Sequence, residues 1–153
     1  MLFRSMHNSP IGIRVMCDTY FLKKLLSQYL ITDDFHMVAN DLDNTPDAGK
    51  GNGILCHDKK EERLSVAPEQ RWPLNESVPF RLDLMPTYDQ KVDIWKIPSV
   101  VESLLGDVDG SSFAKSKLRK MMGRCLATNP EQRPTANEVL QEFLRVQKFI
   151  SSL

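Results

Sequence analysis

The chain has 153 residues, of which 41% are hydrophobic and 26% charged, so it suits one globular domain with a core of its own. Lys plus Arg and Asp plus Glu number 20 each, and the formal charge of zero gives no electrostatic reason to expect nucleic acid or an anionic membrane as partner. No apolar run approaches the roughly 20 residues that cross a bilayer. The cysteines Cys17, Cys56 and Cys125 form no C-x-x-C pair, which disfavours a zinc site, and leave open reduced thiols or one disulfide with a spare.

The first half of the chain favours short elements separated by loops. Residues 2–9 are typical of the last turns of a helix, and residues 11–17 are apolar and β-branched, which favours an extended strand. Residues 21–30 carry apolar side chains at the spacing of one helical face, and residues 36–39 form a second short strand. Residues 43–65 have the composition of a loop, and such a length in a compact domain indicates a function.

The second half is predicted to be helical. Residues 68–86 are extended and interrupted by prolines, and helical character starts after them. Residues 92–105 are apolar enough to be buried on most sides, whereas residues 113–126 and 135–153 are amphipathic. The last helix starts with the capping-box pattern Thr135-Ala136-Asn137-Glu138. The chain is therefore expected to be mainly α.

Three motifs in a fixed order resemble those of protein kinases. Val66-Ala67-Pro68-Glu69 contains the A-P-E that closes a kinase activation segment, although a proline turn with an exposed Glu would have the same letters. Tyr88-Asp89-Gln90-Lys91-Val92-Asp93-Ile94-Trp95 is similar to the Y-x-x-K-x-D-[IV]-W that opens the large buried helix of a kinase lobe. Cys125-Leu126 with the later Arg133-Pro134-Thr135 resembles the C-L-x-x-x-P-x-x-R-P-[ST] near the end of such domains, where the alternative is a loop entering a capped helix.

This resemblance implies one partial domain over residues 1–153, the C-terminal lobe of the protein kinase-like fold, which is α+β overall. In that family the Arg of the last motif pairs with the Glu of A-P-E, so Glu69 and Arg133 are expected to meet across the core, with Asp93 as a further structural residue. The Gly-rich loop, the strand Lys and the helix Glu that grip ATP cannot be found in the sequence. We therefore expect the N-terminal lobe to be absent from this chain.

The candidate catalytic residues lie upstream of A-P-E and depart from the kinase pattern H-R-D-x-x-x-x-N and D-F-G. Met16-Cys17-Asp18 and Asp41-Leu42-Asp43 stand at these places. Asp18 would orient the acceptor hydroxyl, and Asp41 would hold Mg²⁺ against the β- and γ-phosphates. Gln28 is the candidate for the second metal-side ligand, after a small insertion, although its stem is longer and less preorganised than that of Asn. Both aspartates could instead be turn residues.

Longer stretches resemble one family in particular, the protein O-mannose kinases, over nearly the whole chain. They begin with Ser9-Pro10-Ile11-Gly12-Ile13-Arg14-Val15-Met16-Cys17-Asp18 and continue with Leu26-Ser27-Gln28-Tyr29-Leu30, Ala39-Asn40-Asp41-Leu42-Asp43, Val66-Ala67-Pro68-Glu69-Gln70, Trp72-Pro73, Asp83-Leu84-Met85-Pro86 and Asp93-Ile94-Trp95-Lys96-Ile97-Pro98. These matches are more specific than the general kinase motifs.

The resemblance implies an enzyme that phosphorylates the 6-hydroxyl of an O-linked mannose, in a short glycan on dystroglycan, with ATP and Mg²⁺ or Mn²⁺. Its partner would be an O-mannosyl glycan of a glycoprotein acceptor, and no nucleic acid. The family is held in the endoplasmic reticulum membrane with the kinase domain on the lumenal side, and the membrane anchor is expected only in the full-length protein. Asn75-Glu76-Ser77 is an N-glycosylation sequon, and Asn75 would be its acceptor.

Three hypotheses stay open from the sequence. In the first, the chain carries the acceptor-side and metal-side residues of a protein O-mannose kinase but is inactive alone. In the second, it is a non-catalytic pseudokinase or binding module. In the third, it is a divergent Ser/Thr protein kinase, which the Met16-Cys17 pair and the insertion before Gln28 disfavour. Magnesium-dependent ATP binding and the choice of acceptor distinguish the three.

Overall fold

The computed structural model describes residues 2–17, 19, 21–34, 36–49, 51, 53–56 and 66–152. Within these ranges the chain is mainly helical, as the sequence predicted, and it has one two-stranded sheet. The helices and strands are α1 Leu2–His7, α2 Leu22–Ser27, β1 Tyr29–Ile31, β2 Met37–Ala39, α3 Lys91–Leu105, α4 Ser111–Cys125 and α5 Ala136–Ile150. Short 3₁₀ turns lie at Pro68–Gln70, Leu82–Leu84 and Pro130–Gln132. Among the described helices, none has the length and apolar character that a membrane span requires.

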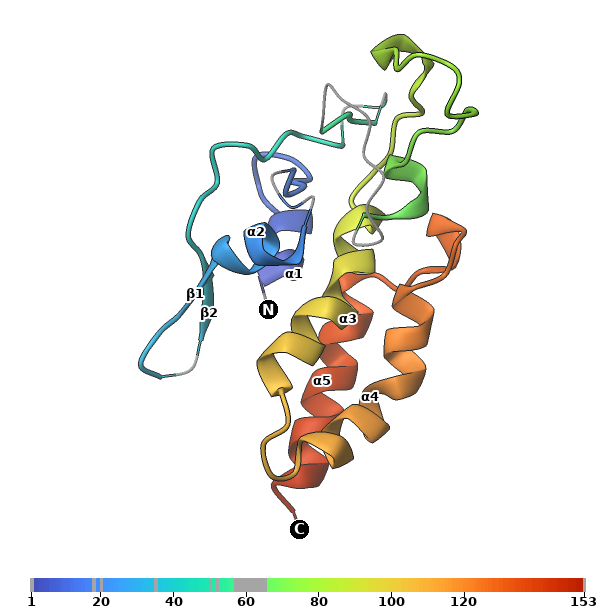
Figure 1. Cartoon of the computed structure of the whole chain (residues 1–153). Helices are drawn as coiled ribbons and strands as arrows, with labels where there is room; N and C mark the ends of the chain where they lie inside the picture. The colour runs from blue at the N-terminus through green and yellow to red at the C-terminus, as the bar shows by residue number, and fades with distance from the viewer. Residues whose placement is uncertain are drawn as a thin grey trace.

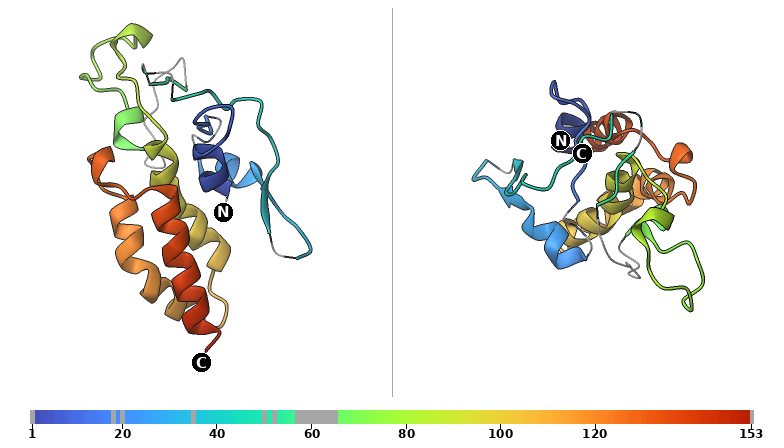
Figure 2. Two further views of the ribbon diagram at one scale, coloured as in Figure 1. Left: turned by 180° about the vertical axis from the view of Figure 1, so that it is seen from behind. Right: turned by 90° about the horizontal axis from the view of Figure 1, so that it is seen from above.

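The second half of the chain forms a layer of three helices, α3, α4 and α5, which lie side by side (Figures 1 and 2). The reversal between α3 and α4 uses Gly106 and Gly110, whose φ angles of 48° and 82° disfavour residues with a side chain. At the start of α5, Thr135 Oγ1 accepts a hydrogen bond from Glu138 N (3.2 Å), and Thr135 N donates to Glu138 Oε2 (2.7 Å). The predicted capping box is therefore confirmed.

The first half of the chain covers one side of this layer. α1 lies against α5, and α2 lies against α3. β1 and β2 form an antiparallel hairpin with Tyr29 opposite Ala39. The helix predicted over residues 21–30 is wrong at its C-terminal end, because α2 ends at Ser27 and Tyr29 already starts a strand. Pairing with β2 outweighs the helical spacing of the apolar residues here.

Two buried clusters hold the halves together, and residues 15–17 lie between them. The larger cluster joins all five helices and consists of Phe3, Met6, Met16, Leu25, Tyr29, Ile94, Ile97, Val100, Met121, Cys125, Ala136 and Val139. The smaller cluster consists of Val15, Cys17, Ile54, Ala67, Tyr88 and Val92. Met16 thus packs into one cluster while its two neighbours pack into the other, as expected for extended backbone with alternating side chains.

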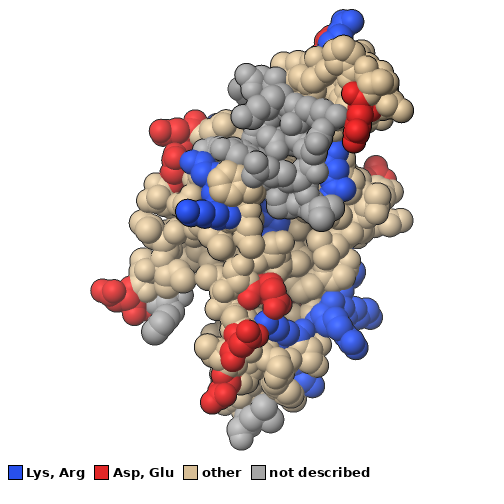
Figure 3. All heavy atoms as spheres, viewed as in Figure 1, with Lys and Arg blue, Asp and Glu red and all other residues tan. Residues whose placement is uncertain are grey.

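Charged side chains are unevenly distributed on the face shown in Figure 3. Lys and Arg gather over α4, whose exposed residues include Lys117, Arg119 and Lys120. Ion pairs on this surface, such as Arg124 with Glu138 (3.1 Å), join α4 to α5. Exposed pairs of this kind contribute about 1 kcal/mol or less. The fold therefore depends on the two buried clusters and on the few buried ion pairs described next.

Candidate active site

Residues 13–17, which lead into Asp18, run antiparallel to residues 44–48. Backbone hydrogen bonds join the two segments, from Val15 N to Pro46 O (3.2 Å), from Cys17 N to Asn44 O (3.1 Å) and from Ala48 N to Ile13 O (2.8 Å). The extended conformation predicted for residues 11–17 is found over residues 13–17, whereas Ile11 lies in a turn and Gly12 has a φ of 112°. The pairing brings the candidate catalytic loop against the residues that follow Asp41. Asp18 itself lies outside the described residues, so its role stays a prediction.

The first turn of α3 holds the same segment from another side. Met16 N donates a hydrogen bond to Asp93 Oδ2 (3.3 Å), and Lys96 Nζ donates to Met16 O (3.0 Å). Lys96 Nζ is also paired with Asp93 Oδ1 at 3.1 Å, and the two side chains are 1% and 0% exposed. Buried charges need both a partner and hydrogen bonds, and this pair has both. Sequence reasoning singled out Asp93 but missed Lys96, although a lysine inside an apolar helix was a signal.

Asp93 also connects α3 to α1. His7 Nε2, at the end of α1, lies 3.2 Å from Asp93 Oδ2. Tyr29 opens β1 nearby, and burial together with the negative charge of Asp93 raises the pKa of its hydroxyl. The Tyr29 hydroxyl therefore stays protonated at physiological pH. A small polar group of His7, Asp93 and Lys96 is therefore buried beside residues 15–17, next to the apolar clusters.

The β1–β2 hairpin places the two candidate metal ligands close in the fold. Gln28 follows α2 directly, and its carbonyl oxygen accepts a hydrogen bond from Asn40 N, the residue before Asp41 (2.8 Å). Gln28 is buried, whereas Asp41 is exposed and its Oδ1 accepts from Asp43 N (3.0 Å). A carboxylate and an amide are oxygen donors of the kind that Mg²⁺ and Mn²⁺ accept. The described residues contain no cluster of three or more acidic, His or Cys side chains that could hold a metal ion, so metal binding by Gln28 and Asp41 stays a prediction.

Glu69 and Arg133 form the pair expected from the kinase motifs. Arg133 Nη1 donates to Glu69 Oε1 (2.5 Å) and Arg133 Nη2 donates to Glu69 Oε2 (2.8 Å), the two-pronged geometry that suits guanidinium and carboxylate. The guanidinium also donates to Ala127 O (2.8 Å) and lies 5.0 Å from the centre of the Trp95 ring. The A-P-E turn is therefore tied both to α3 and to the segment that precedes α5.

A disulfide joins the segment that precedes Asp18 to the segment that contains Cys56. Cys17, the residue before Asp18, is bonded to Cys56, and 39 residues separate the two in the sequence. Cys56 N in turn donates to the Tyr88 hydroxyl (2.6 Å), just before α3. Cys125 is the free thiol, buried between the helices, and burial raises its pKa to about 12. The sequence left the pairing of the three cysteines open, because only the fold brings Cys17 and Cys56 together.

The predicted glycosylation acceptor Asn75 lies in an exposed turn. Its carbonyl oxygen accepts a hydrogen bond from Val78 N (2.9 Å), and its side-chain Oδ1 accepts from Ser77 N (3.0 Å). A sequon must be accessible to be modified, and this one is. Glycosylation of Asn75 stays a prediction.

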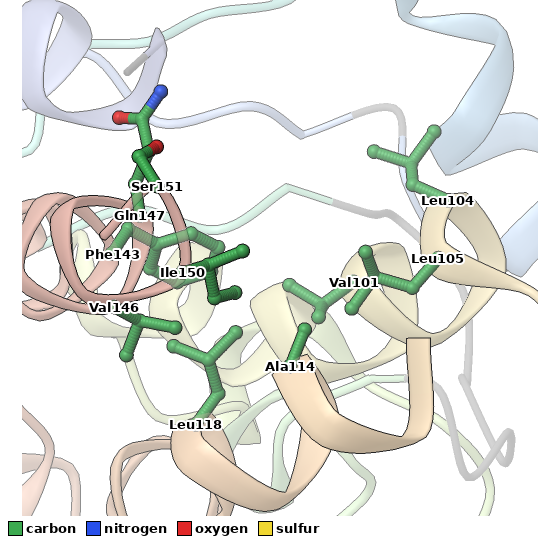
Figure 4. A pocket seen from close by; sticks show the side chains of 10 residues that line it. All are labelled: Val101, Leu104, Leu105, Ala114, Leu118, Phe143, Val146, Gln147, Ile150 and Ser151. Carbon is green, nitrogen blue, oxygen red and sulfur yellow. The ribbon is translucent and has the colours of Figure 1, made fainter. Parts of the chain in front are cut away.

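An apolar hollow in the helical layer does not belong to this site. It is a cavity of about 330 Å³ near the C-terminal ends of α3 and α5, and Figure 4 shows its lining. Aliphatic and aromatic side chains such as Val101, Leu118 and Phe143 line it, with Gln147 and Ser151 as its polar members. Without charged or nucleophilic groups in its lining, it offers nothing to phosphoryl transfer.

No family model matches the chain, but curated proteins do. The protein O-mannose kinase of Homo sapiens is 46% identical over 143 residues, and that of Xenopus laevis is 48% identical over 143 residues, in both cases 92% of this chain. The protein O-mannose kinase of Gallus gallus is 47% identical over 147 residues, which is 95% of this chain. The resemblance to protein O-mannose kinases is confirmed. The chain spans only 41–42% of the length of these relatives.

Proposed function

We propose that residues 1–153 form the acceptor-side and metal-side wall of an ATP-dependent kinase, which phosphorylates the 6-hydroxyl of an O-linked mannose on a glycoprotein, in a glycan of the dystroglycan type. The observation that carries this proposal is the 46–48% identity to protein O-mannose kinases over at least 92% of the chain. A mainly helical fold with one hairpin is compatible with the C-terminal lobe of a kinase. The two-pronged bond between Glu69 and Arg133 supports that fold assignment further.

The proposed roles follow from where charge develops during phosphoryl transfer. Asp18 would accept the proton of the sugar hydroxyl and aim its oxygen at the γ-phosphate. Asp41 and Gln28 would hold Mg²⁺ or Mn²⁺, which neutralises charge on the β- and γ-phosphates when it is bound. The hydrogen bond from Asn40 N to Gln28 O joins the backbone next to these two proposed ligands, which supports the assignment. Pairing between residues 13–17 and 44–48 would hold the acceptor side against the metal side.

The setting we propose is the lumenal side of the endoplasmic reticulum membrane. Two features of the described residues agree with this setting. The Cys17–Cys56 disulfide persists in oxidising compartments and is rare in the cytosol. The sequon at Asn75 is exposed, as an acceptor for lumenal glycosylation must be.

The experiment uses a two-lobed chimera, in which residues 1–153 are joined to the N-terminal lobe of the Xenopus laevis relative. The chimera is secreted from cells, purified, and given labelled ATP with Mg²⁺ and either of two acceptors. One acceptor is a glycopeptide that bears an O-mannosyl glycan, and the matched control is the same peptide without the sugar. We expect label on the mannose 6-position of the glycopeptide, none on the bare peptide, and none after chelation of the metal.

Other outcomes favour the other hypotheses. Label on the bare peptide would identify a Ser/Thr protein kinase. A chimera that binds Mg-ATP or the glycan and transfers nothing would identify a pseudokinase or binding module. Either result contradicts the proposed function.

A further inference from the structure

Two successive peptide units before Asp18 are held by side chains from one turn of α3. The unit that ends in Met16 N is bonded to Asp93 Oδ2 (3.3 Å), and the unit that contains Met16 O is bonded to Lys96 Nζ (3.0 Å). On its other edge, the second unit is held by Cys17 N, which donates to Asn44 O (3.1 Å). Because both its carbonyl and its amide are bonded, from opposite sides, this peptide plane cannot rotate without breaking a buried hydrogen bond.

Stability alone does not explain why the Asp93–Lys96 ion pair is buried among apolar side chains. Lys96 and Asp93 are 1% and 0% exposed, and their neighbours Ile94 and Ile97 belong to the larger apolar cluster. Replacing a buried ion pair by apolar residues of similar size often leaves stability unchanged or raises it, because removing charges from water is costly. In some proteins a buried ion pair is retained because it specifies one conformation. Here the conformation that it specifies is that of the Met16 backbone.

The residues just before Asp18 provide no charged side chain that could hold the Met16 backbone in place. The residues before it, Met16 and Cys17, are both uncharged, and both are buried. The ammonium group that lies against this backbone comes instead from Lys96, and its Met16 contact spans 80 residues of sequence. Lys96 also keeps the Asp93 carboxylate in place, since it is bonded to Asp93 Oδ1 (3.1 Å) while Oδ2 takes the Met16 amide.

We propose that Lys96 is a positioning residue for phosphoryl transfer, in an inference that rests on the proposed function. Lys96 and Asp93 together set the direction in which the chain enters residue 18, and thereby the place of the carboxylate that meets the acceptor hydroxyl. Transfer depends on positioning, and a displacement of about 1 Å can lower a rate by about 100-fold. The hydrogen bonds of Lys96 to described residues go to Met16 and Asp93 and to neither proposed metal ligand, so its loss should act on turnover rather than on Mg-ATP affinity.

The first test is made on residues 1–153 without any assay of activity. It measures the clamp, by which we mean the hydrogen bonds from Asp93 and Lys96 to the Met16 backbone. Amide hydrogen exchange is compared in the unchanged chain, in Lys96→Met and in the control Lys115→Met. Lys115 on α4 is a partly buried lysine paired with Glu102 on α3 (2.6 Å), so the control removes the same charge away from Met16. We expect exchange at Met16 and Cys17 to rise by about tenfold or more in Lys96→Met only. The buried Val139 N, which donates to Thr135 O at the start of α5 (3.1 Å), reports unfolding away from residue 16 and should not change.

A second variant covers the possibility that Lys96→Met leaves Asp93 as an unpaired buried charge and does not fold. The double change Asp93→Asn with Lys96→Met removes both charges at once. Asn keeps an acceptor for Met16 N, while Met16 O loses its bond to α3. The same selective rise at residues 16 and 17 is expected. Unchanged exchange at these residues in the folded double variant overturns the proposal.

The second test measures transfer to the mannosyl glycopeptide by the two-lobed chimera. With Lys96→Met or the double variant, kcat should fall by about tenfold or more, while the Kd of Mg-ATP stays within about twofold. The Lys115→Met chimera should keep both values. Unchanged kcat, or equal losses in kcat and in Mg-ATP affinity, would overturn the positioning role. An unchanged chimera without activity would contradict the proposed function, whereas the exchange rates at residues 16 and 17 would still decide on the clamp.

Discussion

Arg133 and Glu69, 64 residues apart in the sequence, are joined by two nearly parallel hydrogen bonds of 2.5 and 2.8 Å. The Arg133 side chain is fully buried and that of Glu69 is 15% exposed. Further bonds run from the guanidinium to the carbonyl oxygens of Lys91 and Ala127. One arginine therefore connects the A-P-E turn, the start of α3 and the segment before α5.

Removing this arginine should destabilise the fold severely. Arg133→Ala leaves the Glu69 carboxylate and several carbonyl groups without their donor, at a cost of about 3–5 kcal/mol in the free energy of unfolding. Urea unfolding followed by circular dichroism measures the change. The control is Arg145→Ala, which removes an exposed pair with Glu142 and should cost about 1 kcal/mol or less. If the two substitutions lowered the free energy of unfolding equally, Arg133 would not stabilise the fold more than an exposed arginine does.

The disulfide gives a second prediction about stability. Closing a loop between residues 39 apart restricts the unfolded chain, so replacing Cys17 and Cys56 together by Ser should cost about 2–4 kcal/mol. Thermal unfolding of the unchanged and the doubly substituted chain measures this loss. Thiol titration in denaturant, on unreduced protein secreted from cells, should give one thiol per chain. Three thiols would show that the bond does not form.

The remaining thiol should be inert in the native state. Burial raises the pKa of Cys125 to about 12, so between pH 7 and 9 the group is the neutral thiol, and the thiolate needed for alkylation appears only near the raised pKa. Mass spectrometry after treatment with iodoacetamide at pH 8 should find Cys125 unmodified in the folded chain and modified in denaturant. Rapid native alkylation at pH 8 would mean that Cys125 is not packed as described.

The sequence predicted the helices well where the signals are local. The capping pattern at Thr135 and Glu138 fixed the start of α5, because a cap depends on residues three apart. The end of α2 was predicted wrongly, since Tyr29 and its neighbours fit a helical face as well as a strand. Only the partner strand, with Ala39 opposite Tyr29, decides between the two.

Residues of the candidate site that belong to known motifs could be identified from the sequence. Residues that belong to the site only through tertiary contacts could not. The pairing of Glu69 with Arg133 followed from two motifs whose order is fixed in kinases. The bond between Cys17 and Cys56 and the contact of Lys96 with Met16 each join distant segments, which no spacing rule relates. The roles of Asp18, Gln28 and Asp41 stay predictions that require an assay.

Residues 1–153 by themselves should not catalyse transfer. Positioning of ATP requires a Gly-rich loop and a phosphate-binding lysine opposite the metal side, and neither motif occurs in this sequence. Calorimetry with Mg-ATP should show no micromolar binding to the chain, and no label should reach the mannosyl glycopeptide. The two-lobed chimera is the positive control. Micromolar binding together with turnover by residues 1–153 alone would require a different nucleotide site.

The most direct test of the whole account compares Asp18→Asn with Asp41→Asn in the two-lobed chimera. Each substitution removes one charge and keeps the side-chain size. If Asp18 serves the acceptor and Asp41 the metal, Asp18→Asn should abolish transfer to the mannosyl glycopeptide while the Kd of Mg-ATP stays nearly constant. Asp41→Asn should weaken Mg-ATP binding as well as turnover. Comparable loss of nucleotide affinity in both variants, or full turnover with Asp18→Asn, would contradict this account of the site.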